Sequence, residues 1–544
     1  MLLVLVLWPI VCALLIAMAP ARQARQIAFG GSLVVLALTV VAAFMFPWED
    51  SAAYHALGVE SVPFLPSLGV QMSFGVDAVA MWLIILTGFL APLTIWGSFT
   101  AIQERERTYY AWLMALNAAM FGVFVARDII FFYVAFEFTL VPLFILISLY
   151  GSANRKFAAI KFFLYTFLGS IIALAGLVYV AWKASAGIEG WTFQIDALQA
   201  AARMMSPREQ ALVMLALMAG FAVKVPLFPV HTWLPLAHTE APTAGSVILA
   251  GVLLKLGTYA IFRFVLPFVP LAVNQHAGFI AVLSIVGIIY AGLICWVQTD
   301  VKKLVAYSSV SHLGFCVLGM FALNSVGAAG SVLYMINHGL STGALFFCIG
   351  FMYERYHTRS MEEVGGLASR MPVWAFFMVF FTLASVGLPG LNGFVSEFMC
   401  LMGAFQSNAA DLGAGGTGGP LGPWYAAIAG TGMVVAAMYL LIMVGKVVFG
   451  DLREPASHHD HHDESHLPAD LSRREIGVLV PLALGCLVLG VYPRPILSTI
   501  EEPVARVMAQ LQIDTPGETD LAADDVDGRA VEQLLVVQAG GVER

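Results

Sequence analysis

The stretch Phe221–Pro229 reads FAVKVPLFP and places a lysine and two prolines inside an apolar run of the chain. Pro226 and Pro229 each lack a backbone donor and clash with the carbonyl four residues earlier, so a helix is expected to end just after Lys224. The ammonium would then lie in the last turn of a half-helix, where the carbonyl end of the helix dipole stabilises a cation. Burial disfavours the same charge, and a lysine held between these two effects can gain and lose a proton.

The composition around this stretch is that of a membrane protein. The chain has 544 residues, of which 60% are hydrophobic and 11% are charged. Soluble domains are about 45–50% apolar and about 25% charged. This composition excludes a soluble globular enzyme, a disordered chain, a disulfide scaffold and a nucleic-acid-binding domain. The six cysteines stand singly in apolar runs without metal-binding spacing, so we expect them to be small core residues.

Apolar runs of about 20 residues, the length that crosses a bilayer, predict fourteen transmembrane helices. They are expected at about 1–19, 27–47, 76–98, 108–126, 128–150, 157–182, 208–230, 243–265, 277–298, 302–322, 327–353, 371–406, 423–449 and 476–493. The first run has no basic region before it, so it is expected to be a spanning helix and not a cleaved signal. The runs are too long and too continuously apolar for barrel strands. The sequence therefore predicts an all-α polytopic membrane protein.

The positive charges predict the orientation. Sixteen Lys and Arg residues, Lys302 among them, fall in loops on one side of the predicted membrane. Six fall on the other side: Arg127, Lys183, Arg203, Arg208, Arg263 and Arg494. Because cytoplasmic loops carry the excess of positive charge, both termini are expected on the outer side. The segment 497–544, with ten acids and three arginines, is expected to be a solvated outward tail.

Six ionisable residues interrupt the predicted helices, where charge is costly and is a functional candidate by default. They are Glu137, Lys224, Lys255, His312, His338 and Glu397. Polar side chains share the helical faces of three of them: Thr258 and Tyr259 with Lys255, Ser308 and Ser309 with His312, and Tyr334, Ser341 and Thr342 with His338, beside which Asn337 lies. Such stripes can hold water between titratable groups, and histidine titrates near neutral pH. We interpret the six residues as a proton-transfer row, and the alternative is a structural scaffold of ion pairs and packing histidines.

A second break is expected in the stretch 387–397, GLPGLNGFVSE, at Pro389 and Gly390. It leaves Glu397 near the start of the next half-helix. Interrupted helices at matching positions of two units are typical of transporter repeats, and an odd number of spans per unit requires inversion. The predicted organisation is three N-terminal helices (1–107), two inverted five-helix repeats (108–265 and 277–449), a His-rich inward loop (450–475), a last helix (476–496) and the tail (497–544).

Two local motifs are interpreted as linkers. The run Gly413–Gly418 matches the dinucleotide pattern G-x-G-x-x-G, but it follows a membrane helix instead of a strand. The run His458–His466 holds imidazoles and carboxylates that suit zinc or nickel, but it lies in a loop that is expected to be flexible. Neither motif is expected to hold a cofactor.

The residues around Lys224 also carry a resemblance. The stretches Phe221–Val247 and Leu249–Lys255 resemble the antiporter-like membrane subunits of respiratory complex I, and the similarity extends over about residues 70–495. Glutamate at position 397 is typical of the M-type subunits, whereas the L-type and N-type subunits usually carry lysine there. The resemblance implies fourteen helices in inverted five-helix repeats, with broken seventh and twelfth helices.

The same resemblance implies roles for the residues and the chain. It makes Glu137 the modulator of Lys224, Lys255 the central lysine, His312 and His338 a polar bridge, and Glu397 the terminal proton site. The chain would be a non-redox, proton-translocating subunit of NADH-quinone oxidoreductase, with two half-channels joined by this row. It would hold no cofactor or metal, because flavin and iron–sulfur clusters belong to partner subunits.

The implied partners are the L-type and N-type neighbours and the lipid bilayer, without nucleic acid, in a bacterial inner membrane. Two alternatives share the fold: a subunit of an Mrp-type cation/proton antiporter, and a subunit of a membrane-bound hydrogenase. The antiporter reading would predict lysine at position 397, where this sequence has glutamate.

Overall fold

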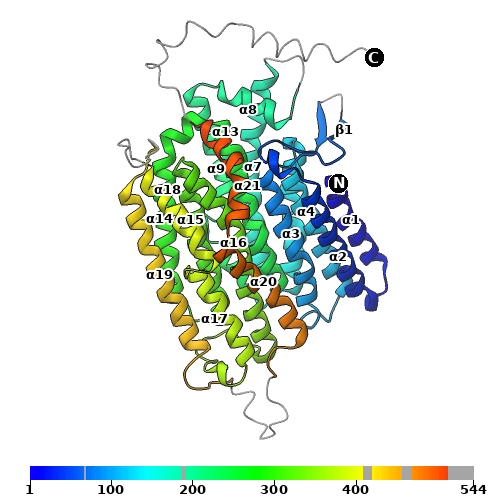
Figure 1. The fold of residues 1–544 in the computed structure, drawn as a ribbon. Helices are drawn as coiled ribbons and strands as arrows, with labels where there is room; N and C mark the ends of the chain where they lie inside the picture. The colour runs from blue at the N-terminus through cyan, green and yellow to red at the C-terminus, as the bar shows by residue number, and fades with distance from the viewer. Residues whose placement is uncertain (66–68, 187–190, 408–418, 456–468, 512–544) are drawn as a thin grey trace. The chain divides into compact units, whose positions relative to one another are not determined.

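The computed structural model describes residues 1–65, 69–186, 191–407, 419–455 and 469–511 (Figure 1). This part of the chain is helical except for loops and one antiparallel hairpin of β1 (Ser61–Leu65) and β2 (Val70–Ser73). Within it, eleven helical segments are long and apolar enough to cross a membrane. The protein is therefore an all-α polytopic membrane protein, as the composition predicted.

Helices occupy every one of the fourteen predicted segments. The unbroken ones are α1 (Leu2–Met18), α2 (Ala21–Met45), α3 (Ala78–Gly97), α4 (Glu106–Val125), α7 (Arg155–Ser185), α14 (Pro270–Trp296), α15 (Val301–Phe321), α16 (Ser325–Tyr356), α19 (Pro423–Val447) and α20 (Arg473–Val491). The number of membrane crossings and the inverted relation of the two five-helix units stay predictions.

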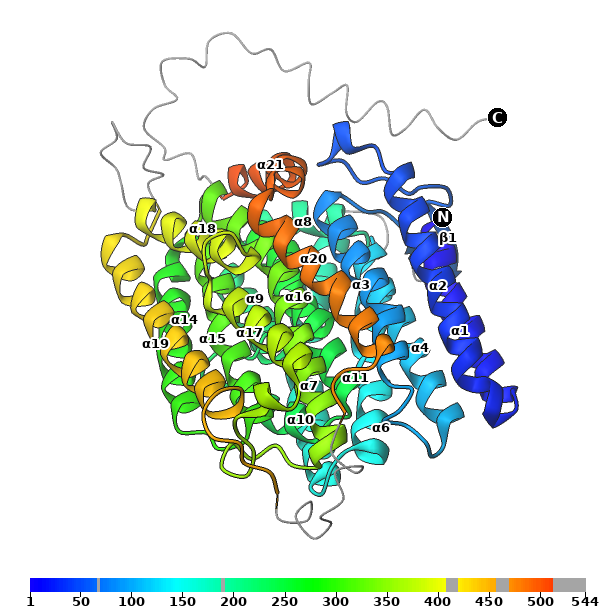
Figure 2. The same ribbon diagram turned by 60° about the horizontal axis from the view of Figure 1, so that its bottom comes forward.

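The helices differ in how deeply they are buried. α1 and α2 lie at one side of the bundle, α14 and α19 lie at the opposite side, and α16 lies between them (Figures 1 and 2). α16 is buried along almost its whole length, whereas α2 leaves Phe44 86% exposed. A helix that is apolar on all sides belongs in a core, and apolar side chains on the outer helices suit lipid. The candidate residues on α16 are therefore shielded from bulk lipid and solvent.

Three segments are broken. α9 (Pro207–Lys224) ends at Lys224 and the chain resumes as α10 (Leu234–Glu240), which confirms the first predicted break. α17 (Pro372–Val386) and α18 (Asn392–Gln406) flank the second predicted break. A third break, between α5 (Ile129–Phe138) and α6 (Leu140–Tyr150), was not predicted. Pro142 explains it, because proline cannot bond to the carbonyl of Phe138 four residues earlier.

The predicted eighth span contains two π-helical turns. It consists of α11 (Thr243–Ile248), η3 (Leu249–Leu253), α12 (Leu254–Ala260), η4 (Ile261–Val265) and α13 (Leu266–Phe268). π-bulges interrupt the regular pattern of backbone hydrogen bonds and occur frequently at functional sites. Lys255 lies on α12, directly after the first of these turns.

The prediction of a solvated tail from residue 497 is wrong for its first part. Arg494–Ala509 form helix α21, which packs against α16 and α3. Its buried residues Ile496, Ile500 and Val504 recur every four positions, the period of an amphipathic helix. A second amphipathic helix, α8 (Ile195–Arg203), precedes α9. Residues 512–544 lie outside the described residues, as do the Gly413–Gly418 and His458–His466 motifs.

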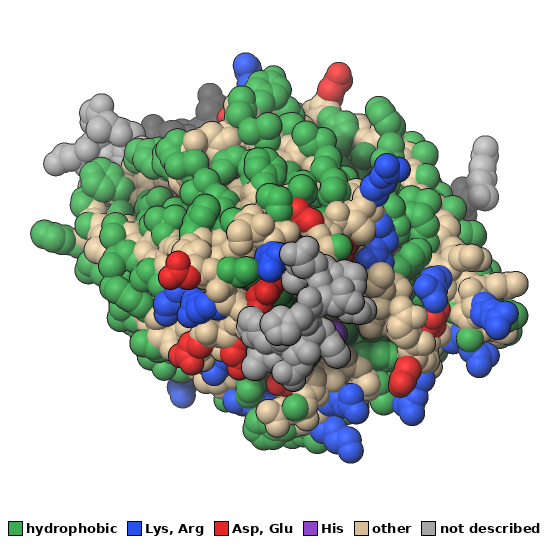
Figure 3. Space-filling model, turned by 90° about the horizontal axis from the view of Figure 1, so that it is seen from below, with side chains coloured by type: hydrophobic (Ala, Val, Ile, Leu, Met, Phe, Trp, Pro, Cys, Tyr) green, Lys and Arg blue, Asp and Glu red, His purple; other side chains and the backbone are tan. Residues whose placement is uncertain are grey.

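Three cations assigned to loops from the sequence have buried side chains. Arg127 pairs with Asp196, and Arg263 donates to Asp77 over 2.7 Å. Lys302 lies in the first turn of α15 and donates to a backbone carbonyl. Partners compensate the cost of burying these charges. Seen from the lower end of Figure 1, the bundle still presents many Lys, Arg, Asp and Glu side chains, as a water-facing end should (Figure 3). All six cysteines are buried, as predicted.

Candidate functional site

The structure separates the six predicted residues into two groups. Lys255 and His338 form one hydrogen-bonded pair, and His312, Tyr334 and Glu397 form a second hydrogen-bonded group. The facing rings of His338 and His312 join the two, and the five residues are called the central row below. Lys224 and Glu137 form a second set with Thr139 and Phe136, called the Lys224 cluster. No side chain of the central row is more than 4% exposed.

The break after α9 places Lys224 in the Lys224 cluster. The Nζ atom of Lys224 donates to the Oγ1 atom of Thr139 over 3.0 Å and lies 4.5 Å from the centre of the Phe136 ring. The indole nitrogen of Trp233 donates to the carbonyl of Val223, a backbone group that the broken helix leaves without its usual partner. Thr139 is the residue at the break between α5 and α6, so two helix breaks meet at this lysine.

Glu137 is held more loosely than its position suggests. Its carboxylate oxygens are buried and make no hydrogen bond to the described residues. The Ser170 hydroxyl donates to the carbonyl of Thr166 and also lies close enough to the Glu137 carboxylate to interact with it. Glu137 and Lys224 interact electrostatically, but they do not form an ion pair within 4 Å in the described part of the chain. The lysine is therefore held by a neutral hydroxyl and a ring, and the Glu137 carboxylate acts on it through space without a direct ion pair.

Lys255 begins the central row on α12. Its ammonium donates to the carbonyl of Ala250, which lies in the first π-helical turn. It also lies 2.7 Å from the Nδ1 atom of His338. An ammonium can only donate, so Nδ1 of His338 accepts and a proton can pass between the two atoms. The π-helical turn thus provides the carbonyl that holds this fully buried charge.

The central row ends at Glu397. The Tyr334 hydroxyl donates to Oε1 of Glu397 over 2.5 Å, and Nδ1 of His312 lies 2.6 Å from the same hydroxyl. His312 also lies 3.3 Å from Oε1 of Glu397. These three side chains come from α16, α18 and α15. The carboxylate is therefore held by two groups that can each carry a proton.

Between these two ends, His338 and His312 face each other. Their ring centres are 5.8 Å apart, and the Nε2 atom of each ring is buried without a hydrogen-bond partner in the described residues. Buried polar atoms are normally satisfied by protein or by ordered water. The gap between the rings is thus the place where a water molecule would complete the row.

Backbone features fix the carboxylate end. Asn337 on α16 donates to the carbonyl of Asn392 over 2.6 Å, and Asn392 donates back to the carbonyl of Asn337. Gly387 ends α17 with φ of 83°, a left-handed conformation that favours glycine. A Cβ atom at Gly387 would lie 2.7 Å from Oε2 of Glu397. The glycine therefore permits both the turn and the approach of the carboxylate.

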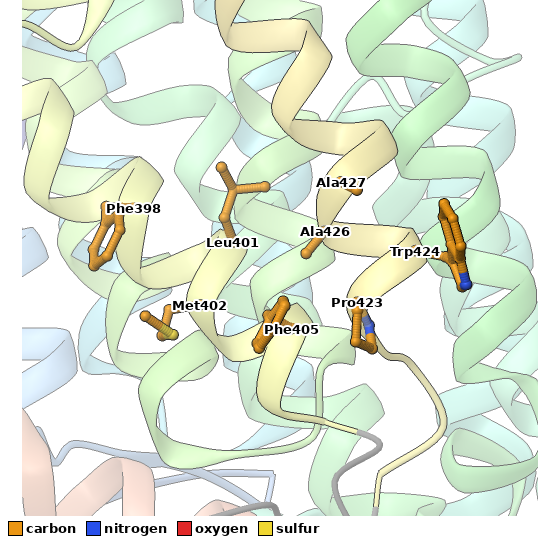
Figure 4. A pocket seen from close by; sticks show the side chains of 8 residues that line it. All are labelled: Phe398, Leu401, Met402, Phe405, Pro423, Trp424, Ala426 and Ala427. Carbon is orange, nitrogen blue, oxygen red and sulfur yellow. The ribbon is translucent and has the colours of Figure 1, made fainter. Parts of the chain in front are cut away.

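An apolar cavity of about 510 Å³ lies between α18 and α19 and does not belong to this site. Figure 4 shows the side chains that line it: Phe398, Leu401, Met402, Phe405, Pro423, Trp424, Ala426 and Ala427. None of these residues can titrate. The cavity begins at Phe398, the residue after Glu397 on α18. The Glu397 carboxylate contacts Tyr334 of α16 and His312 of α15 and none of the residues that line the cavity.

The sequence left some functional candidates unmarked. Pro142, three residues after Thr139, indicates the helix break at which Thr139 lies. The sequence marks Tyr334 as part of a polar stripe but does not indicate its hydrogen bond to Glu397. Two further titratable residues are buried. Lys302 was expected in a loop, and His238 was not singled out from the sequence. His238 had no polar stripe on its own helix that would single it out.

Comparisons with known proteins identify the family of the chain. The family described as NADH:quinone oxidoreductase/Mrp antiporter, TM matches residues 126–415. NADH-quinone oxidoreductase subunit M of Rhodobacter capsulatus is 40% identical over 452 residues, which cover 82% of this chain and 84% of that protein. NADH-ubiquinone oxidoreductase chain 4 of Marchantia polymorpha is 37% identical, over 94% of this chain and 97% of that protein.

Solved structures show the same fold. A chain of respiratory complex I from Thermus thermophilus matches with a TM-score of 0.81 and 27% identity, over 94% of this chain and all (100%) of that one. A chain of the Mrp complex from Dietzia sp. DQ12-45-1b matches with a TM-score of 0.75 at 20% identity, which supports the fold alone. The chain therefore belongs to the NADH:quinone oxidoreductase/Mrp antiporter family of membrane subunits.

Proposed function

We propose that this chain is an M-type, non-redox subunit of NADH-quinone oxidoreductase that moves protons across the membrane. The observation that carries the proposal is the central row, which links Lys255 to Glu397 through groups that can each bind and release a proton. The relatives named as subunit M and chain 4 support the assignment to this type. Glu397 supports it as well, because the resemblance associates glutamate at this position with the M type.

The proposed proton path follows the hydrogen bonds. Lys255 gives its proton to Nδ1 of His338, and the imidazolium releases a proton from Nε2 toward His312. From His312 the proton reaches Glu397 directly or through the Tyr334 hydroxyl. The steps from Lys255 to His338 and from His312 to Glu397 join atoms 2.7 Å and 3.3 Å apart, and the step between the two histidines would pass through a water molecule. One half-channel would lead to Lys255 and the other away from Glu397.

The Lys224 cluster is the proposed control element. When Glu137 is close, the carboxylate stabilises the ammonium of Lys224. When it withdraws, the buried charge lacks a counter-ion and tends to lose its proton toward Lys255, because an unpaired buried charge is costly. Gly257 lets α12 approach the end of α9, since a Cβ atom there would lie 3.1 Å from Cβ of Lys224. The two lysines therefore lie on directly packed segments.

Electron transfer belongs to other subunits in this proposal. Flavin and iron–sulfur clusters would be held by partners, and this chain would respond to the electrostatic or conformational signal they send along the membrane arm. The expected neighbours are L-type and N-type subunits in a bacterial inner membrane. Both chain termini would face the outer side. The excess of Lys and Arg in the loops of one side supports this orientation.

Glu137→Gln tests the proposal in membranes that contain the assembled complex. The substitution keeps the size of the side chain and removes the charge that acts on Lys224. We expect NADH-driven quinone reduction and the proton gradient to fall together. Glu104→Gln, at an exposed glutamate, is the matched control and should change neither. Normal rates of both processes in the Glu137 variant would contradict the proposal.

The same experiment tests the alternative that the chain is a subunit of an Mrp-type cation/proton antiporter. The chain shares its fold with a chain of the Mrp complex. An Mrp-type subunit would exchange sodium for protons without NADH. Loss of such exchange in the Glu137→Gln variant, with NADH oxidation unchanged, would assign the chain to that function instead.

A further inference from the structure

A buried arginine lies beyond Lys255 on the same helical segment, outside the row described above. Arg263 is in η4, the second π-helical turn, and its side chain is 6% exposed. Its Nη2 atom donates over 2.7 Å to Oδ1 of Asp77, the N-cap residue of α3. Its Nη1 atom donates to the Tyr54 hydroxyl, and its Nε atom donates to the Tyr259 hydroxyl over 3.3 Å. All three nitrogen atoms of the guanidinium therefore have fixed partners.

This arginine lines a polar cavity. Arg263, Asp77 and Tyr54 contribute to one cavity of about 360 Å³ together with residues of α8 and α21. α8 and α13 lie at the upper end of the bundle in Figure 1, which is the outer side in the proposed orientation. The Tyr54 ring also contacts a second guanidinium, that of Arg127, which lies 3.2 Å from the ring centre. Water that enters the cavity from the outer side therefore reaches a charged and tightly packed wall.

The wall lies close to the central row. Tyr259 is four residues from Lys255 and four from Arg263, the spacing of neighbours on one helical face. Four residues correspond to about 6 Å along a helix. The Tyr259 hydroxyl can pass a proton, because it both donates and accepts. A proton that passed Arg263 and reached this hydroxyl would be about one helical turn from Lys255.

We propose that Arg263 and Asp77 form a barrier that keeps protons of the outer side from returning to Lys255. A guanidinium does not lose its proton in a protein, so it cannot pass one on. Its positive charge also repels hydronium ions, and a fixed arginine excludes protons in this way from water-conducting pores. Asp77 holds the charge in place and compensates the cost of its burial. The inference rests on the proposed function, because the barrier protects the gradient that the central row builds.

Removal of both charges together tests the barrier. Arg263→Gln combined with Asp77→Asn leaves neither ion buried without its partner, and asparagine can still cap α3. The assembled complex is placed in phospholipid vesicles, and the decay of an imposed pH gradient is followed without NADH. We expect the double variant to increase the decay rate several-fold over that of the wild-type complex. With NADH present, quinone reduction should continue while the steady gradient is smaller, whereas variants of the central row should lower both.

Two further variants assign the leak to its path. Arg506→Gln is the matched control, because Arg506 lines the same cavity but is exposed and donates to the backbone carbonyl of Ala52 over 3.0 Å. It should leave the decay of the gradient unchanged. Addition of Lys255→Ala to the double variant should return the decay rate to that of the wild type, because the leak then lacks its acceptor.

The outcomes distinguish the barrier from the proposed function. If the double variant stays tight while Lys255→Ala abolishes pumping, the barrier is refuted and the central row stands. A leak that persists after the addition of Lys255→Ala, or an equal leak in the Arg506→Gln complex, would also overturn the inference. If Lys255→Ala pumps normally, the proposed function fails and the barrier fails with it. Should the double variant not assemble, Arg263→Gln alone decides by the same outcomes.

Discussion

The two broken helices hold their charges in opposite ways. At the first break, Lys224 contacts a neutral hydroxyl and an aromatic ring, and its expected counter-ion Glu137 forms no hydrogen bond within the described residues. At the second break, Glu397 is bonded by Tyr334 and lies beside His312, and Asn337 and Asn392 fasten its helix to α16. One charge is loosely held, and the other is held tightly.

This difference suggests a division of labour. A loosely held pair can change its separation at little cost, so it suits a control element that responds to a signal. A tight set of charge-assisted hydrogen bonds fixes donor and acceptor positions and suits proton transfer. Substitutions at the second break should therefore affect proton transfer most directly, and those at the first break should affect coupling.

Glu397→Gln should have the largest effect. The amide preserves the volume and one acceptor oxygen but cannot take up a proton. Loss of a positioned proton-transfer group slows such steps by about 10²–10⁴-fold. We expect NADH-driven proton translocation by this subunit to be lost while the amount of assembled complex is unchanged. Glu397→Asp, which retains the carboxylate, should recover part of the activity, and an active Gln variant would remove Glu397 from the path.

Tyr334→Phe should have an intermediate effect. It removes the hydroxyl between His312 and Glu397, but the direct approach of 3.3 Å between these two residues remains. A hydrogen bond to a charged group contributes about 1.5–3 kcal/mol, so the carboxylate should be less well fixed. We expect slower proton translocation with a larger solvent isotope effect. Wild-type rates would show that the path does not need the hydroxyl.

Thr139→Val should have a smaller effect, confined to coupling. The side chains have the same shape, but valine cannot accept the hydrogen bond from Lys224. The ammonium keeps its contact with the Phe136 ring, so the site is weakened but not lost. Measured together, quinone reduction and the proton gradient should fall moderately. Thr139→Ser restores the hydroxyl and should restore both, and a defect equal to that of Glu397→Gln would refute the division of labour.

Gly387→Ala should have the smallest effect on proton transfer and should act mainly on stability. The left-handed conformation costs a residue with a Cβ atom roughly 1–2 kcal/mol. The new methyl group would lie 2.7 Å from Oε2 of Glu397, the flexible end of that side chain, whereas the bonds to Tyr334 and His312 are made by Oε1. We expect a lower thermal unfolding temperature. Gly430→Ala on α19, where nothing lies within 4 Å of an added Cβ atom, is the control and should not destabilise the protein.

Sequence patterns predicted the parts of this protein that depend on strong local signals. Proline and glycine mark both predicted helix breaks, and isolated charges in apolar runs mark six residues that the structure buries fully or partly. The two breaks confirm that backbone chemistry determines where α9 and α17 end. Pro142 gives the same signal for the end of α5, but the apolar run 128–150 predicts one continuous helix there.

Features that depend on tertiary contacts could not be predicted. Nothing in Leu249–Leu253 distinguishes a π-helical turn from a regular one. The burial of the His238 ring depends on Phe346, which is distant in sequence. The amphipathic period of α21 was obscured because the acidic residues after it dominate the charge of the whole tail. Such features arise when distant segments meet.

Lys255→Ala tests the central claim most directly, because this lysine joins the central row to every path that could supply it. In membranes with the assembled complex, the account predicts that NADH-driven proton translocation and quinone reduction both fall. Lys156→Ala, at an exposed lysine, should leave both unchanged. A Lys255→Ala complex that assembles, reduces quinone and pumps protons at wild-type rates would contradict the account.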